Sequence, residues 1–111
     1  MRWLLRSKIH RATVTQACTD YTGSITIDKE LVERSGLIPG EKILVSSITS
    51  GNRLETYVIE GKTGEICING AAAKLIKKGE EIIIMGFELS DKKIKPQIIL
   101  VDKGNKFVKY L

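Results

Sequence analysis

The chain has 111 residues, 42% of them hydrophobic and 28% charged, and a net charge of +5. This length corresponds to one domain with a modest core, and the hydrophobic content excludes an intrinsically disordered chain. The longest apolar runs, at 82–85 and 98–101, are far shorter than the roughly 20 residues of a membrane span. The apolar part of the N-terminus is too brief for a signal peptide. We therefore expect a cytoplasmic protein with no membrane partner.

The residues that bind metals or stack on nucleic-acid bases are scarce. One histidine and two cysteines, Cys18 and Cys67, lie far apart in the sequence, so we expect no metal site. Both cysteines lie in apolar, strand-like segments and are expected to be small buried hydrophobic residues. Aromatic residues make up 5% of the chain, too few for base-stacking platforms. We expect a mildly basic, solvated surface and no nucleic-acid partner.

The first predicted strand covers residues 8–15, where apolar and polar side chains alternate. Because side chains of a strand alternate between its two faces, one face is expected to carry Lys8, His10, Ala12 and Val14. A second strand is expected at 25–27. One face of it carries Ile25 and Ile27, and the opposite face carries Ser24 and Thr26.

A short helix is predicted between the second and third strands. Asp28 suits the N-cap, the helix extends to about Ser35, and Gly36 suits the position after its C-terminus. Pro39 and Gly40 then turn the chain into a strand at Lys42–Ser47.

The next strand, at 53–60, follows a hairpin turn at 50–52. Its alternation separates two sets of side chains. Arg53, Glu55 and Tyr57 share one face, and Leu54, Thr56 and Val58 share the other.

The remaining chain predicts further short elements. A strand at 65–68 ends at Asn69 and Gly70, and a small helix begins at 71–73 and is closed by Gly79. Further strands are expected at 81–88, Gln97–Val101 and Phe107–Tyr110, with a flexible loop at 89–95. Many short strands with two small helices indicate a compact β-barrel formed by one domain, 1–111.

Two local features have a chemical interpretation. The Ser24 hydroxyl could attack the carbonyl of Gly23 and turn an amide into an ester, which needs a backbone geometry that glycine tolerates best. The small residues at 69–73 would leave backbone N–H groups approachable by an anion. Taken alone, Gly23 and Ser24 favour a turn that enters a strand over a reactive bond.

Four segments together are more specific than either feature. In order and spacing, 7–15, 21–28, 53–57 and 69–73 resemble the pyruvoyl-dependent L-aspartate 1-decarboxylase family, and the resemblance extends from Lys8 to about Asp102. It implies a mainly β fold, a double-psi β-barrel with two or more short helices, assembled as a homotetramer. The implied reaction decarboxylates L-aspartate and makes β-alanine for pantothenate and coenzyme A.

The resemblance also implies a self-made cofactor. Ser24 would attack Gly23, and the chain would separate into residues 1–23 and 24–111, the longer piece beginning with a pyruvoyl group derived from Ser24. Thr56 matches the residue that polarises the scissile carbonyl, a role that suits a hydroxyl donor. The pyruvoyl ketone would form a Schiff base with L-aspartate and accept the electrons released as carbon dioxide leaves.

The other site residues follow from the same resemblance. Arg53 matches a carboxylate-binding arginine, which can form paired hydrogen bonds. Tyr57 matches the proton donor, and Lys8 matches a cation that contacts substrate or a chain end. The turn that contributes donors to the site matches Asn69, Gly70, Ala71 and Ala72. The residues that match the pocket lining are His10 and Tyr21.

Some positions depart from the family pattern, and other functions stay open. Ser47 and Ser50 stand where asparagines are common, and Cys18 replaces a common aspartate. A different class of protein is suggested by 25–43, which resembles the strand–helix–turn–strand unit of swapped-hairpin DNA-binding regulators. An inactive barrel that never cleaves is a third possibility.

Overall fold

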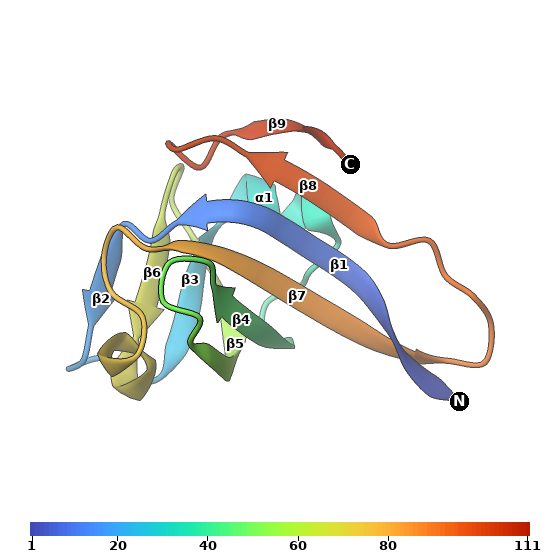
Figure 1. Ribbon diagram of the computed structural model, residues 1–111, viewed down its shortest axis with the longest axis horizontal. Helices are drawn as coiled ribbons and strands as arrows, with labels where there is room; N and C mark the ends of the chain where they lie inside the picture. The colour runs from blue at the N-terminus through green and yellow to red at the C-terminus, as the bar shows by residue number, and fades with distance from the viewer.

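The computed structural model describes residues 1–111, which form a nine-stranded sheet with one α-helix and one 3-10 helix (Figure 1). The strands are hydrogen-bonded in the order β2-β6-β3-β5-β4-β7-β1-β8-β9. The elements are β1 Arg2–Thr13, β2 Gln16–Cys18, β3 Ser24–Asp28, α1 Lys29–Ser35, β4 Lys42–Ser47, β5 Arg53–Gly61, β6 Ile66–Asn69, η1 Gly70–Lys74, β7 Glu81–Ser90, β8 Gln97–Val101 and β9 Phe107–Tyr110. Neither helix has the length and apolar content needed to cross a bilayer.

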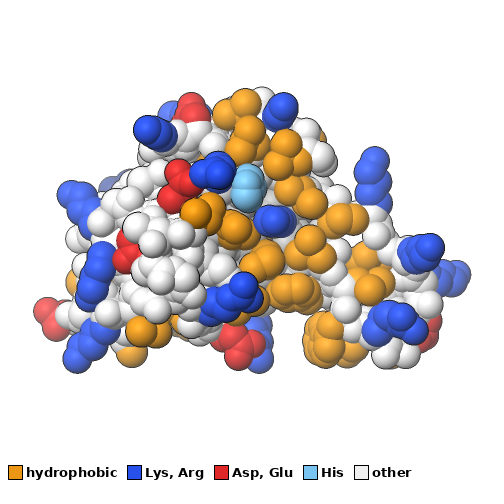
Figure 2. Space-filling view, in the orientation of Figure 1, with side chains coloured by type: hydrophobic (Ala, Val, Ile, Leu, Met, Phe, Trp, Pro, Cys, Tyr) orange, Lys and Arg blue, Asp and Glu red, His pale blue; other side chains and the backbone are white.

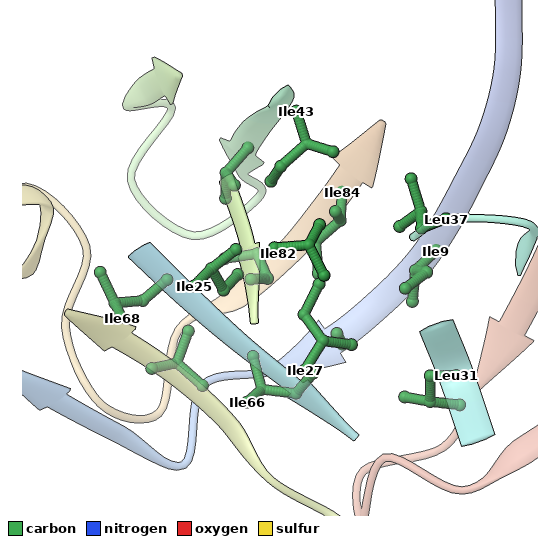
Figure 3. Close-up of a cluster of buried hydrophobic side chains, with 14 of the residues drawn as sticks. Ile9, Ile25, Ile27, Leu31, Leu37, Ile43, Ile66, Ile68, Ile82 and Ile84 are labelled. Atoms are coloured by element: carbon green, nitrogen blue, oxygen red, sulfur yellow. The ribbon is translucent and has the colours of Figure 1, made fainter. Parts of the chain in front are cut away.

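One hydrophobic core joins strands from both ends of this order. Its 19 buried residues include Ile9 of β1, Ile25 of β3, Ile66 of β6 and Ile84 of β7 (Figure 3). Because distant strands of the sheet share one core, the sheet curves around it. The mainly β, barrel-like fold class is therefore confirmed, while its double-psi connectivity stays a prediction.

At Arg11, the side of β1 that faces the core changes. The pairing with β7 shifts register between His10 and Ala12, and Arg11 has a positive φ of 71°. This bulge inserts one residue into the alternation. Lys8 and His10 share the outer face as predicted, but placing Ala12 and Val14 there was wrong, since both are buried in the core.

The segment from β3 to β4 follows its local signals. The Asp28 carboxylate accepts a hydrogen bond from the Glu30 backbone N–H at 2.8 Å and caps α1. Gly36 ends the helix with a φ of 80°. The predicted helix, its caps and the strand Lys42–Ser47 are confirmed.

Two predicted boundaries in the second half were wrong. The helix that begins near Ala71 is a 3-10 helix ending at Lys74, because the later N–H groups of Lys77 and Gly79 bond to the Glu80 side chain and the Val14 carbonyl instead. The loop predicted at 89–95 begins later, because β7 continues to Ser90 by pairing with the first residues of β1.

Candidate functional site

The Gly23–Ser24 bond lies where the chain leaves a turn and enters β3. Ser24 is the first residue of β3 and is fully buried, whereas Gly23 is exposed. Gly23 has no positive φ, and a Cβ added to it would meet nothing within 4 Å. Gly23 therefore does not adopt the positive-φ conformation that favours glycine.

The Ser24 hydroxyl is held by a side chain of the neighbouring strand. β3 and β6 are antiparallel, with Ser24 opposite Asn69. The Asn69 side-chain amide donates to Ser24 Oγ at 2.9 Å and to Thr26 Oγ1 at 3.0 Å. Asn69 is 3% exposed, so these contacts are shielded from water. The structure thus brings together two of the predicted site residues, Ser24 and Asn69.

The glycine after Asn69 packs directly against the same bond. Gly70 has a φ of 75°, and a Cβ added there would lie 2.7 Å from Gly23 Cα and 3.1 Å from the Tyr21 carbonyl oxygen. Any side chain at position 70 would fill the space that the Gly23 backbone occupies. Ala71 and Ala72 follow in η1, the first exposed and the second partly buried.

β5 lies on the other side of β3. The two strands are parallel, with Ile25 beside Val58. Continuing this register by one residue puts Tyr57 alongside Ser24, and Thr56 precedes Tyr57 on β5. Thr56 is partly buried and lies on the core-facing side of β5 with Val58, whereas Tyr57 is on the outer face and 42% exposed.

Arg53 begins β5 on the same face as Tyr57. Its side chain is exposed, and it takes part in none of the ion pairs of the structure. Between the two, Glu55 is paired with Lys42 of β4 at 3.3 Å. Arg53 is therefore a guanidinium without an acidic partner, at the first residue of the strand that borders Ser24.

Within one chain, Lys8 and His10 stay apart from these residues. His10 is level with Ile83 of β7, Ser46 of β4 and then Arg53 of β5. Three steps between neighbouring strands correspond to roughly 14 Å. The predicted site is thus divided between the region around β3 and the outer face of β1.

The surface around Lys8 and His10 is apolar. Lys8 lies between Met85 and Ile98, and His10 lies between Ile83 and Leu100. Figure 2 shows hydrophobic side chains gathered around the histidine over β1 and β7. Burial, with the nearby charges of Lys8 and Arg11, lowers the pKa of His10 against the opposing effect of Glu81.

The turn before Arg53 is built by serines. Ser47 Oγ donates to Glu80 at 2.6 Å and accepts from the Ser50 N–H at 3.0 Å, while Ser50 Oγ accepts from the Asn52 N–H at 3.2 Å. Burial acts to raise the pKa of Glu80, but the hydrogen bonds from Ser47, the Lys77 backbone and Ser50 hold it below its usual value. The two serines that depart from the family pattern thus close the turn themselves.

Sequence reasoning missed two features of this region. A hollow of about 590 Å³ lies beside β4 and is lined by Trp3, Glu41, Lys42, Ile43, Leu44, Glu55 and Phe87. The second is Cys67, which is buried as predicted and whose thiol also donates to Asn69 Oδ1 at 3.2 Å. No group of three or more His, Cys, Asp or Glu side chains is placed to hold a metal ion.

The family model and the similar proteins found by comparison all point to the same family. A family model described as "Aspartate decarboxylase" matches residues 1–108. Aspartate 1-decarboxylase of Corynebacterium efficiens is 54% identical over 97% of this chain and 84% of its own length. The proteins of that name from Dehalococcoides mccartyi (strain CBDB1) and Thermoanaerobacter pseudethanolicus are 51% and 50% identical, over 96% and 95% of this chain and 90% and 95% of their own lengths. The match extends far beyond 25–43, the segment on which the regulator interpretation depends.

Proposed function

Because the chain belongs to the aspartate decarboxylase family, a family of carboxy-lyases, we propose that it converts L-aspartate to β-alanine and carbon dioxide in the cytoplasm, for pantothenate and coenzyme A synthesis. One observation supports the proposal most directly. The buried Ser24 hydroxyl, at the bond that a self-processing enzyme of this family would cut, receives a hydrogen bond from Asn69.

The proposed processing begins with attack of Ser24 Oγ on the Gly23 carbonyl carbon. A C–O ester bond forms, the C–N peptide bond breaks, and the hydroxyl proton passes to the freed nitrogen. Loss of the Ser24 α-proton then breaks the Cβ–Oγ bond, and Oγ leaves with Gly23 as a carboxylate. Water replaces the nitrogen, which departs as ammonia, and residue 24 becomes a pyruvoyl group. Thr56 would donate to the oxyanion that forms on the Gly23 carbonyl.

The residues around Ser24 fit such a group. Gly70 leaves a cradle that a Cβ would fill, directly at Gly23, and Asn69 offers a donor at the same position. A pyruvoyl group supplies a ketone that condenses with the substrate amine and withdraws electrons during decarboxylation. Arg53 would bind a carboxylate of aspartate with paired hydrogen bonds, and Tyr57 would return a proton to the substrate carbon.

The proposal includes assembly into a homotetramer. Lys8 and His10 lie on an apolar outer face, and three strand spacings along the sheet, roughly 14 Å, separate His10 from Arg53. A neighbouring copy that covers this face would place Lys8 and His10 beside the site of another subunit, with Tyr21 and the turn from Asn69 to Ala72 completing its lining.

The deciding experiment is a mass measurement of the purified protein. We expect two fragments, residues 1–23 and a longer piece with a blocked N-terminus, and we expect Ser24→Ala to stay intact and inactive on aspartate. Thr22→Ala, which changes an exposed residue next to the same bond, is the control and should cleave. An intact wild-type chain after prolonged incubation would contradict the proposal.

A further inference from the structure

We infer that Cys67 is a positioning residue for self-cleavage: its thiol holds the Asn69 amide with the NH₂ group facing the Ser24 hydroxyl. This inference rests on the proposed function, since it concerns how the Gly23–Ser24 bond is cut. It assigns a role to Cys67, which the processing step described above does not use.

The three side chains form a continuous hydrogen-bonded chain on one face of the sheet. Cys67 and Asn69 are two residues apart on β6, opposite Thr26 and Ser24 of β3. Cys67 Sγ donates to Asn69 Oδ1 at 3.2 Å, and Asn69 Nδ2 donates to Ser24 Oγ at 2.9 Å. The exposed fractions are 7% for Cys67, 3% for Asn69 and zero for Ser24. Water therefore has little access to replace any of these partners.

The thiol decides which end of the amide faces Ser24. The hydroxyls of Ser24 and Thr26 can each donate or accept, so they fit either end of the Asn69 amide. A sulfur atom is only a weak acceptor, and turning the amide over would place its NH₂ group beside Cys67 and leave that group poorly satisfied in a buried place. In the observed orientation, the amide NH₂ group donates to two oxygen atoms, and Oδ1 accepts a hydrogen bond from the thiol.

The protonation state of Cys67 suits this role. Burial, with the nearby Glu65 and Cys18, raises the pKa of the Cys67 thiol. The group therefore stays an S–H donor at neutral pH. Cys18, which lies on β2 level with Asn69, takes part in none of these hydrogen bonds.

The orientation of the amide affects the first chemical step. When Ser24 Oγ bonds to the Gly23 carbonyl carbon, the peptide C–N bond breaks and the hydroxyl proton moves to the nitrogen. Negative charge develops on Oγ as its proton leaves, and an N–H donor aimed at this atom stabilises it. A carbonyl oxygen in the same place would repel that charge. Cys67 thus acts on Ser24 through Asn69.

The test compares cleavage rates of variants that keep or remove a hydrogen-bond donor at position 67. Cell-free synthesis followed by intact mass gives the half-time of cleavage for wild type, Cys67→Ser, Cys67→Ala and the control Cys18→Ala. We expect Cys67→Ala to cleave about tenfold more slowly than wild type, the effect of one lost buried hydrogen bond. Cys67→Ser, which keeps a donor, should stay within about threefold of wild type, and Cys18→Ala should match it.

Further measurements separate positioning from folding. Cys67→Thr and Cys67→Val have the same shape and both favour strands, and only the threonine keeps a donor, so Thr should cleave faster than Val even where Cys67→Ala fails to fold. In Cys18→Ala, the infrared S–H band should show a hydrogen-bonded thiol that is released by the further change Asn69→Ala. Equal rates in Ser and Ala, or in Thr and Val, would overturn the inference while leaving self-cleavage intact. A wild-type chain that never cleaves would overturn the proposed function, and with it this role of Cys67.

Discussion

Gly70 and Gly23 are in direct backbone contact: a Cβ on Gly70 would lie 2.7 Å from the Cα of Gly23 and 2.9 Å from its nitrogen. These residues belong to the two segments whose meeting forms the candidate site. The contact is with backbone atoms, which cannot move aside as a flexible side chain could.

We expect Gly70→Ala to slow or abolish cleavage at Gly23–Ser24, because the added methyl group must displace the Gly23 backbone. The positive φ of Gly70 is itself costly for alanine, by about 1 kcal/mol. Gly51→Ala separates the two effects, since Gly51 has a φ of 80° and nothing within 4 Å of an added Cβ. Thermal unfolding should show a loss of stability in both variants, and intact mass should show impaired cleavage only in Gly70→Ala. Normal cleavage in Gly70→Ala would mean that the contact has no part in processing.

Arg53→Ala should leave cleavage unchanged and reduce kcat/KM for aspartate by about 10- to 100-fold, the effect of losing hydrogen bonds to a charged carboxylate. Lys42→Ala is the matched control, because it removes a positive charge from the neighbouring strand that is already paired with Glu55. Steady-state kinetics on fully cleaved protein would measure the difference. An equal loss in the two variants would indicate a general effect of charge instead of a carboxylate-binding arginine.

Ser47→Ala should destabilise the protein by about 2 kcal/mol, since its hydroxyl donates to Glu80 and accepts from the Ser50 N–H. Ser46 offers a control in the adjacent position. Its Oγ is buried without any hydrogen-bond partner, so Ser46→Ala should leave the free energy of unfolding unchanged or raise it. Urea unfolding at neutral pH measures both. The hydrogen bonds of Ser47 contribute nothing to stability if the two variants unfold at the same urea concentration.

The lowered pKa of His10 predicts how the stability of the protein depends on pH. Its pKa in the folded chain is below that of an unfolded histidine, about 6.5, so between these two values the unfolded chain binds more protons. The contribution of His10 to stability is therefore complete above pH 6.5 and is lost as the pH falls toward its folded pKa. His10→Gln cannot titrate, and its free energy of unfolding should fall less than that of wild type between pH 7.5 and 5.5. A parallel decline in both proteins would assign the effect to other groups.

The sequence predicted those elements whose causes are local. Asp28 and Gly36 bound α1 by their own side-chain and backbone preferences, and the alternation of Arg53, Glu55 and Tyr57 with Leu54, Thr56 and Val58 correctly separated the two faces of β5. The bulge in β1 escaped prediction because arginine has no preference for the positive φ that Arg11 adopts.

The candidate site was predictable in part. The family resemblance singled out Ser24 and Asn69, and the structure joins them by a hydrogen bond. The role of Cys67 could not be inferred from the residue itself, since the hydrogen bond to Asn69 matters only through the pairing of β6 with β3, more than 40 residues earlier. The separation of His10 from Arg53 likewise depends on the order of four strands, which no local pattern specifies.

The position of β1 has a consequence for how a processed chain would fold. Residues 1–23 contain all of β1, which pairs with β7 on one side and β8 on the other and contributes Ile9 and Ala12 to the core. After cleavage this piece would remain in place by strand pairing and packing alone. Refolding of the processed protein would then be a bimolecular reaction whose rate depends on concentration, whereas the uncut Ser24→Ala chain would refold at a rate independent of it.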